Sequence, residues 1–259
     1  MVAASKVRRA QEQTVAGKPY AEKLRAIVGD LVGKIEGTTH PYLEEREEGK
    51  TLLILISSDK GLAGSMNTNL LREFIKFSQN NRNIEVISIG RKLLRGVVRM
   101  GGVLVADFPF GTTLPTFEAT LPISKLIVDE FKTGEYKKIV CLYMQFISLA
   151  NQKPVQFQLL PVQKTQKEEG TAVLPYTFEP NPGALLTDLM PHFLEMTLYQ
   201  ILLESYASEQ AARMLAMHQA SENAKDVITE LSLSYNKARQ EKITNELLDI
   251  TGGAMGVAN

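Results

Sequence analysis

The stretch ASEQAARMLAMHQASENAKDVITELSLSYNKARQ (residues 207–240) determines the fold expected for this chain of 259 residues. The last proline is Pro191, and no glycine occurs between residues 184 and 251, so one uninterrupted helix can run through this whole region. Apolar or small side chains recur at steps of three and four, which predicts a narrow seam that packs against a second long helix. The seam residues are Met214, Met217, Ser221, Ala224, Ile228, Leu231, Tyr235 and Ala238.

The opening residues 2–35 predict that second helix, because apolar side chains recur at helical spacing towards its end. Pro19 predicts a kink or a break within it. Residues 1–25 hold six basic and two acidic groups, a net charge of +4, whereas residues 184–259 hold five basic and ten acidic groups, a net charge of −5. These opposite charges favour two terminal helices that lie side by side. The apolar stripe consists of Leu24, Ile27, Val28, Leu31 and Ile35.

Between the two helices, short apolar runs alternate with helical patterns. Residues 51–56 (TLLILI) are continuously apolar, as in a strand that is buried on both faces, and residues 155–159 alternate in the manner of an edge strand. Strands separated by helices of about ten residues predict a doubly wound, mostly parallel sheet. We expect strands at 51–56, 84–89, 103–106, 138–146 and 155–159, and helices at 68–78, 91–100 and 123–131.

The expected fold class is therefore α/β, with a long antiparallel two-helix coiled coil formed by the termini and an inserted doubly wound domain. The expected boundaries are an N-terminal shaft helix at 1–40, a Rossmann-like α/β foot domain at 50–178 and a C-terminal shaft helix at 184–259. A polar surface loop is expected at 163–170.

The composition excludes several classes of protein. Lys plus Arg equals Asp plus Glu, 29 against 29, which argues against a nucleic-acid partner. The single cysteine, Cys141, lies in an apolar run and is expected in the core. The histidines are scattered, so we expect no metal site and no cofactor. The longest apolar stretch, near residues 140–150, is too short to cross a bilayer, so no direct insertion into a membrane is expected.

The loop SSDKGLAGSMN (residues 57–67) lies between a strand and a helix, where α/β sheets commonly bind phosphate groups. The spacing of Gly61 and Gly64 matches neither GxGxxG nor GxxxxGK[ST], so a tight turn is the favoured interpretation. Asp59 and Lys60 are neighbours with no histidine nearby, which favours a surface role over acid–base chemistry. A phosphate- or nucleotide-binding protein remains the alternative, and a generic coiled-coil adaptor is a third hypothesis.

Several stretches resemble the gamma subunit of F-type ATP synthase. They are MVAASKVRRAQ (1–11), SSDKGLAGSMN (57–67), ASEQAARMLAMHQASENA (207–224), YNKARQ (235–240) and ITNELLDITGGA (243–254). The resemblance implies a non-catalytic rotor shaft that couples ion-driven rotation of the membrane c-ring to ATP synthesis and takes part in regulating ATPase activity and proton flow. The implied partners are the alpha and beta subunits, the epsilon subunit and the c-ring. The implied location is peripheral, at the cytoplasmic face of a bacterial plasma membrane.

The resemblance also implies which residues contact neighbouring subunits. Chains of this family carry further helical turns before MVAASK, so the last turns of the C-terminal helix are expected to lack a partner within this chain. We expect residues beyond about 240 to fray in the free subunit and to order only inside the catalytic ring. The implied contact residues are Lys6, Arg8 and Arg9 in the first helix and Arg239, Gln240, Thr244 and Glu246 in the last.

Overall fold

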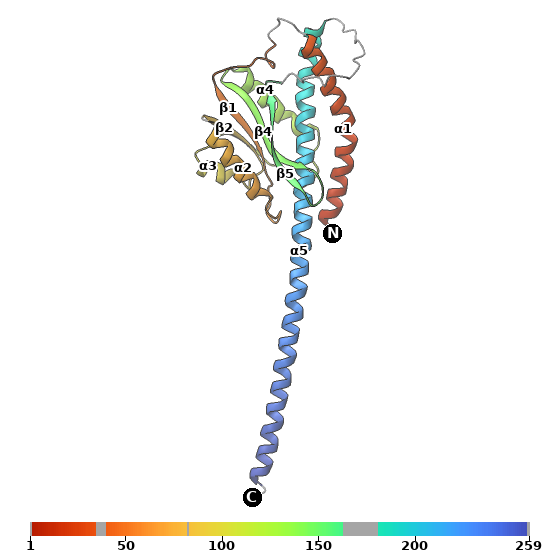
Figure 1. Cartoon of the computed structure of the whole chain (residues 1–259), viewed down its shortest axis with the longest axis vertical. Helices are drawn as coiled ribbons and strands as arrows, with labels where there is room; N and C mark the ends of the chain where they lie inside the picture. The colour runs from red at the N-terminus through yellow and green to blue at the C-terminus, as the bar shows by residue number, and fades with distance from the viewer. Residues whose placement is uncertain (1, 35–39, 82, 163–180, 258–259) are drawn as a thin grey trace. The chain divides into compact units, whose positions relative to one another are not determined.

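The chain begins and ends with a helix, and the elements of an α/β domain lie between these two helices in the sequence (Figure 1). The structure is a computed structural model that describes residues 2–34, 40–81, 83–162 and 181–257, with side chains described as far as residue 248. The elements are α1 (Val2–Lys34), β1 (Lys50–Ile56), α2 (Met66–Asn80), β2 (Ile84–Ile89), α3 (Leu94–Arg99), β3 (Val103–Phe108), the 3₁₀ helix η1 (Glu118–Thr120), α4 (Leu121–Lys132), β4 (Tyr136–Phe146), β5 (Gln152–Leu160) and α5 (Pro182–Val257).

The five strands form one sheet in the order β3-β2-β1-β4-β5. The central strand β1 pairs in parallel with β2 and β4, so that Leu53 lies between Val86 and Val140. Residues 51–56 of β1 are all buried, as a strand covered on both faces must be. The outer strand β5 is antiparallel to β4. The predicted doubly wound, mostly parallel sheet with a wet edge strand is therefore confirmed.

Each face of the sheet is covered by its own set of helices. On one face, Phe74 of α2 and Val97 of α3 pack against strand residues such as Leu53 and Leu55. On the other face, Phe131 of α4 packs in a larger cluster together with side chains of α1 and α5. The two terminal helices are thus part of the main core and do not merely flank the sheet.

The chain divides into two compact units, Met1–Leu215 and Ala216–Asn259. The first unit contains the sheet, α1 and the first part of α5. The second unit consists of the later part of α5. The three boundaries expected from the sequence, 1–40, 50–178 and 184–259, stay a prediction. Ile35 and the expected surface loop at 163–170 lie outside the described residues.

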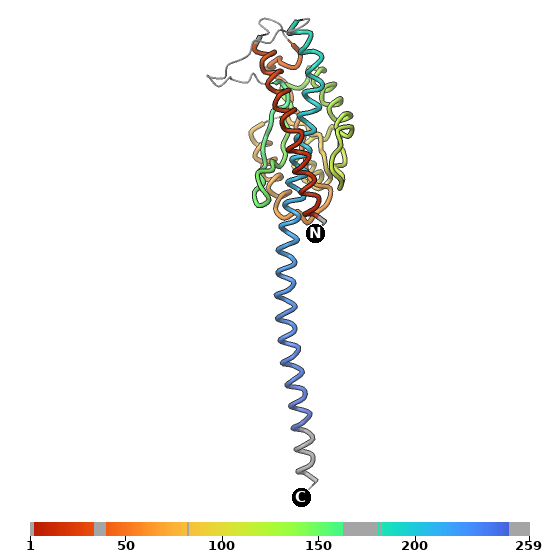
Figure 2. Tube along the Cα trace, turned by 90° about the vertical axis from the view of Figure 1, so that its right-hand side faces the viewer, coloured from red at the N-terminus to blue at the C-terminus, as the bar shows by residue number. Residues whose placement is uncertain are grey.

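Within the first unit, α1 and α5 run antiparallel, as predicted (Figure 2). The hydroxyl of Tyr20 lies 2.8 Å from Nε2 of His192, and the Nε2 amide of Gln200 donates to the carbonyl oxygen of Thr14 over 3.4 Å. The residue number thus rises on one helix as it falls on the other. The helix α1 continues through Pro19, so the proline does not divide it.

Charge complementarity accompanies this pairing. Glu204 of α5 lies among apolar side chains, and this burial raises the pKa of its carboxyl group. A hydrogen bond from Tyr143 and the nearby cations Lys18 and Arg25 of α1 act in the opposite direction on the same pKa. The basic opening helix therefore compensates in part for an acidic group that α5 places in the core.

The position of the pairing differs from the expectation. The partner of α1 is an earlier part of α5 than the predicted seam, and it includes Leu186, Met190, Leu194, Leu198 and Ile201. All five are large apolar side chains, whereas the seam also contains the small residues Ser221, Ala224 and Ala238, so this earlier face buries more apolar surface per turn. Along residues 217–248 the described side chains are exposed.

The connection after β2 makes a closely packed turn that only glycine fits. Gly90 has a φ of +95°, and a Cβ atom there would lie 2.1 Å from the carbonyl oxygen of Ser57. We predict that Gly90→Ala lowers the free energy of unfolding in urea by about 3 kcal/mol or more, because strain and overlap add. Gly101→Ala is the control, since its φ is +80° with no atom within 4 Å, and it should cost about 1 kcal/mol. Equal losses would contradict this account.

Candidate functional site

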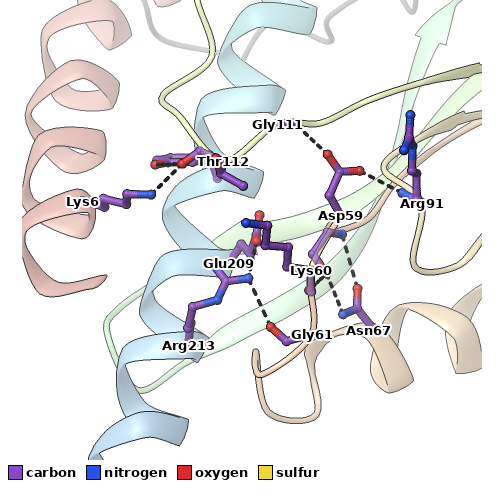
Figure 3. A network of polar contacts seen from close by, with 12 residues as sticks. Lys6, Asp59, Lys60, Gly61, Asn67, Arg91, Gly111, Thr112, Glu209 and Arg213 are labelled. Carbon is purple, nitrogen blue, oxygen red and sulfur yellow. Dashed lines mark hydrogen bonds and ion pairs between the residues drawn. The ribbon is translucent and has the colours of Figure 1, made fainter. Parts of the chain in front are cut away.

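Two of the stretches singled out in the sequence, residues 57–67 and 207–224, meet at the carboxyl end of β1 (Figure 3). Arg213 of α5 donates from Nη2 to the carbonyl oxygen of Gly61 over 3.4 Å and to Oε1 of Glu209 over 2.5 Å. Glu209 and Arg213 are four residues apart, so they share one side of the helix. This side of α5 faces the loop and fixes the helix to the sheet.

Asp59 lies at the carboxyl ends of the parallel strands, which is the edge of the sheet where α/β proteins commonly bind ligands. Its Oδ1 accepts a hydrogen bond from the backbone N–H of Arg91 over 3.0 Å, and its Oδ2 accepts one from the N–H of Gly111 over 2.7 Å. Arg91 follows β2 and Gly111 follows β3, so the carboxylate joins two loops at the carboxyl ends of parallel strands (Figure 3). A negative group of the chain itself occupies a place suited to a phosphate.

This arrangement corrects the expectation that Asp59 and Lys60 share a surface role. Lys60 is exposed, whereas Asp59 is half-buried and bonded on both oxygens. The loop also satisfies its own polar groups. The Nδ2 amide of Asn67 donates to Oγ of Ser58 over 2.8 Å, and that hydroxyl donates to the carbonyl oxygen of Lys60 over 2.7 Å. The nucleotide-binding alternative is accordingly not favoured.

Glu209 is the most buried charged side chain of this region, with 3% of its surface exposed. Its Oε2 atom has no hydrogen-bond partner among the described residues. Burial raises the pKa of Glu209, while the hydrogen bond and charge of Arg213, together with Lys6, oppose the shift. Cations from two helices thus act against the effect of burial on this carboxyl group.

The first helix reaches the same place through Lys6. Its Nζ donates to the carbonyl oxygen of Thr112 over 2.7 Å, and the hydroxyl of Tyr206 donates to the same oxygen over 3.3 Å. We call Lys6, Asp59, Gly61, Glu209 and Arg213 the polar clamp. The polar clamp connects α1, the loop after β1, the loop after β3 and α5, which are distant in sequence.

The polar clamp could not be predicted from the sequence pattern, in which residues 57–67 and 207–224 fall into separate expected domains. The spacing of Glu209 and Arg213, an ion-pair spacing on a helix side that is otherwise rich in alanine, was the available signal.

The predicted contact residues lie as follows. Arg8 and Arg9 are exposed on α1, and Arg8 pairs with Glu12 over 3.0 Å. Lys6 belongs to the polar clamp. The remaining predicted residues are exposed in the second unit, and their role in contacting partners stays a prediction. They are Arg239, Gln240, Thr244 and Glu246.

The described part of the chain contains neither a candidate metal site nor a candidate membrane span. Its His, Cys, Asp and Glu side chains nowhere gather in a group of three or more that could hold a metal ion. None of the helices in that part combines the length and apolar character that crossing a membrane requires.

We predict that Arg213→Met destabilises the chain in a pH-dependent way. It leaves the buried Glu209 carboxylate unpaired, which costs about 3–5 kcal/mol at neutral pH. Because burial raises the pKa of Glu209 in the folded state, the penalty is absent below the unfolded-state pKa and grows as the pH rises through the folded-state pKa. Urea unfolding should therefore show a larger loss at pH 8 than at pH 5.

The double variant Arg213→Met/Glu209→Gln is the matched control for this prediction. It removes both charges, so it should recover much of the lost stability and lose the additional pH dependence. The same loss at both pH values in the single variant, or no recovery in the double variant, would contradict the burial of an unpaired carboxylate.

Comparisons with known proteins agree with this fold. A family model described as ATP synthase matches residues 1–257. The ATP synthase gamma chain of Dehalococcoides mccartyi is 42% identical over 261 residues, an alignment that covers 100% of this chain and 91% of the relative. The gamma chain of Desulforamulus reducens is 35% identical, with 98% and 90% covered.

Solved structures show the same architecture. The central stalk and c-ring structure of Tetrahymena thermophila mitochondrial ATP synthase contains a chain with a TM-score of 0.65 and 24% identity, covering 85% of this chain and 96% of that one. A chain of the Euglena gracilis mitochondrial enzyme has a TM-score of 0.64 and 18% identity, covering 98% and 95%. From the family match, the identity to its relatives and the shared fold, this chain belongs to the ATP synthase family as a gamma subunit.

Proposed function

We propose that this gamma subunit is the rotating central shaft of the enzyme, with the later part of α5 enclosed by the catalytic subunits. The observation that carries the proposal is the surface of residues 217–248, where large apolar side chains are exposed. At 3.6 residues per turn, Ile228 and Leu233 point in directions about 140° apart, so a single groove could not cover both. A surrounding ring of partners can cover apolar side chains on several sides of one helix.

Exposed polar residues of the same segment support a surrounding ring that offers polar as well as apolar contacts. Arg239, Gln240 and Glu246 are exposed, and the ion pair of Glu246 with Lys242, at 3.8 Å, is weak because both side chains are exposed. These groups are available to partners. The proposed partners are the alpha and beta subunits around α5, the c-ring at the foot domain and, from the family resemblance alone, the epsilon subunit.

The structural neighbours support the first two kinds of partner. The Tetrahymena structure is described as central stalk and c-ring, and the Euglena structure includes F1 and the c-ring. By analogy, the proposed location of this chain is peripheral, at the cytoplasmic face of a bacterial plasma membrane. Ion-driven rotation of the c-ring would turn the foot domain, and the polar clamp would pass that torque to α5. Its part in regulating ATPase activity and proton flow belongs to the same proposal.

The subunit itself would perform no chemistry in this proposal. The shaft hypothesis expects a tagged chain to co-purify with a large ATPase, whereas a generic coiled-coil adaptor would not bring down ATPase activity. Isothermal titration of the isolated chain with ATP separates the nucleotide-binding alternative, since the shaft hypothesis expects no specific binding.

We predict that Arg239→Ala combined with Gln240→Ala lowers ATP turnover of the assembled enzyme by about tenfold or more. Hydrogen bonds to charged groups contribute about 1.5–3 kcal/mol each, and about 1.4 kcal/mol corresponds to a factor of ten in rate. The stability of the isolated chain should change by less than about 0.5 kcal/mol, because both side chains are exposed on a helix.

Arg72→Ala combined with Lys125→Ala is the control, because it removes two exposed side chains from helices of the foot domain. The control should leave turnover unchanged. Normal turnover together with a large loss of stability in the Arg239 and Gln240 variant would show that these residues support the helix and not the contact with the ring.

A further inference from the structure

One part of the foot domain carries an unbalanced positive charge. Residues 90–106, which contain α3 and lead into β3, include four basic residues and no acidic residue. All four basic side chains are exposed, and the ion pairs observed among the described residues involve none of them. They are Arg91, Lys92, Arg95 and Arg99.

Apolar side chains are exposed beside these cations. Val98, Met100 and Val103 expose 56%, 49% and 57% of their surfaces. On α3, Arg95, Val98 and Arg99 are three and four residues apart, so they share the outer side of the helix, while Val97 is buried against the sheet. We call Arg95, Val98, Arg99, Met100 and Val103 the basic edge.

The basic edge lies at an outer edge of the sheet. Among the described residues the strand β3 is the outermost strand on its side and pairs with β2 alone, so half of its backbone N–H and C=O groups point away from the sheet. The opposite edge strand, β5, carries Lys153 and Pro154, residues that discourage the addition of a further strand. The sequence VLVADF of β3 has neither; it carries one acidic residue, the exposed Asp107 near its end, and its register shifts opposite Val86 and Ile87.

We propose that the basic edge binds an acidic, extended segment of a partner protein, which adds a strand to β3. The carboxylates of the segment would pair with Arg95 and Arg99, its backbone would bond to β3, and its apolar side chains would cover Val98, Met100 and Val103. The register shift limits regular pairing to a short segment.

Two other occupants fit the surface less well. A second copy of the chain, paired through β3, would bring two sets of four cations together, and like charges repel. An anionic lipid surface would neutralise the cations, but it would offer no partner to the outward-facing backbone groups of a strand. An acidic extended segment satisfies both the charge and the strand.

The segment that precedes the basic edge, residues 90–92, is hydrogen-bonded to the rest of the foot domain. The backbone N–H of Arg91 is bonded to Asp59, and that of Lys92 donates to the carbonyl oxygen of Ser58 over 3.0 Å. The N–H of Gly90 donates to the carbonyl oxygen of Phe108 over 2.8 Å, which connects the start of this segment to the end of β3. The backbone that leads into the basic edge is therefore already ordered before a partner binds.

The test uses the purified ATPase assembly, so it depends on the proposed function for its material. Amide hydrogen exchange is compared between the isolated chain and the assembly, and Val103→Cys carrying a photoreactive cross-linker is introduced into the assembled enzyme. We expect slower exchange of β3 amides in the assembly and a cross-link that mass spectrometry locates in an acidic segment of another subunit.

Charge reversal supplies the matched comparison. Arg95→Glu/Arg99→Glu should abolish the Val103 cross-link and the slower exchange, whereas Arg72→Glu/Lys125→Glu, with the same change in net charge on exposed positions, should leave both unchanged. Unchanged exchange of β3 in the assembly, a cross-link to a second copy, or a cross-link formed equally in phosphatidylglycerol vesicles without other subunits would overturn the inference. If the chain does not enter the assembly at all, the proposed function fails instead.

Discussion

The packing of α5 against the sheet is the constraint on which the rest of the structure depends. It provides one wall of the larger core, and α1 packs against the sheet and α5 together. Apolar packing alone would permit the helix to slide by a turn, since leucine and methionine are interchangeable at modest cost. The Glu209–Arg213 pair has one favourable position, where Arg213 reaches the carbonyl oxygen of Gly61. A buried ion pair adds little net stability, and we infer that this one specifies the register of α5.

Much of the fold could be predicted from the sequence because the relevant signals are local. The run TLLILI and the apolar stretches after it identify the strands, and the alternation of strands and helices implies a parallel sheet. The position at which α1 meets α5 could not be predicted in this way. The seam from Met214 to Ala238 and the face around Leu194 and Leu198 both have helical spacing, and only the three-dimensional packing shows which one is buried.

The candidate site was harder to predict than the fold. Its contacts join residues separated by more than a hundred positions, such as Lys6 with Thr112 and Arg213 with Gly61. Each residue alone is an ordinary charged or small residue on a helix or in a loop. Their chemistry becomes apparent only when the sheet places the ends of β1, β2 and β3 together. The contact residues in the second unit were proposed from family resemblance, because exposure on a single helix does not distinguish one polar residue from another.

The carboxylate of Asp59 has a consequence for how folds of this kind change function. It sits where two backbone N–H groups, those of Arg91 and Gly111, converge at the end of a parallel sheet. A shaft of this kind and a phosphate-binding enzyme could therefore differ at a single side chain. In the shaft, that side chain is a carboxylate bound to the two N–H groups; without it, the same two groups are open to an anion.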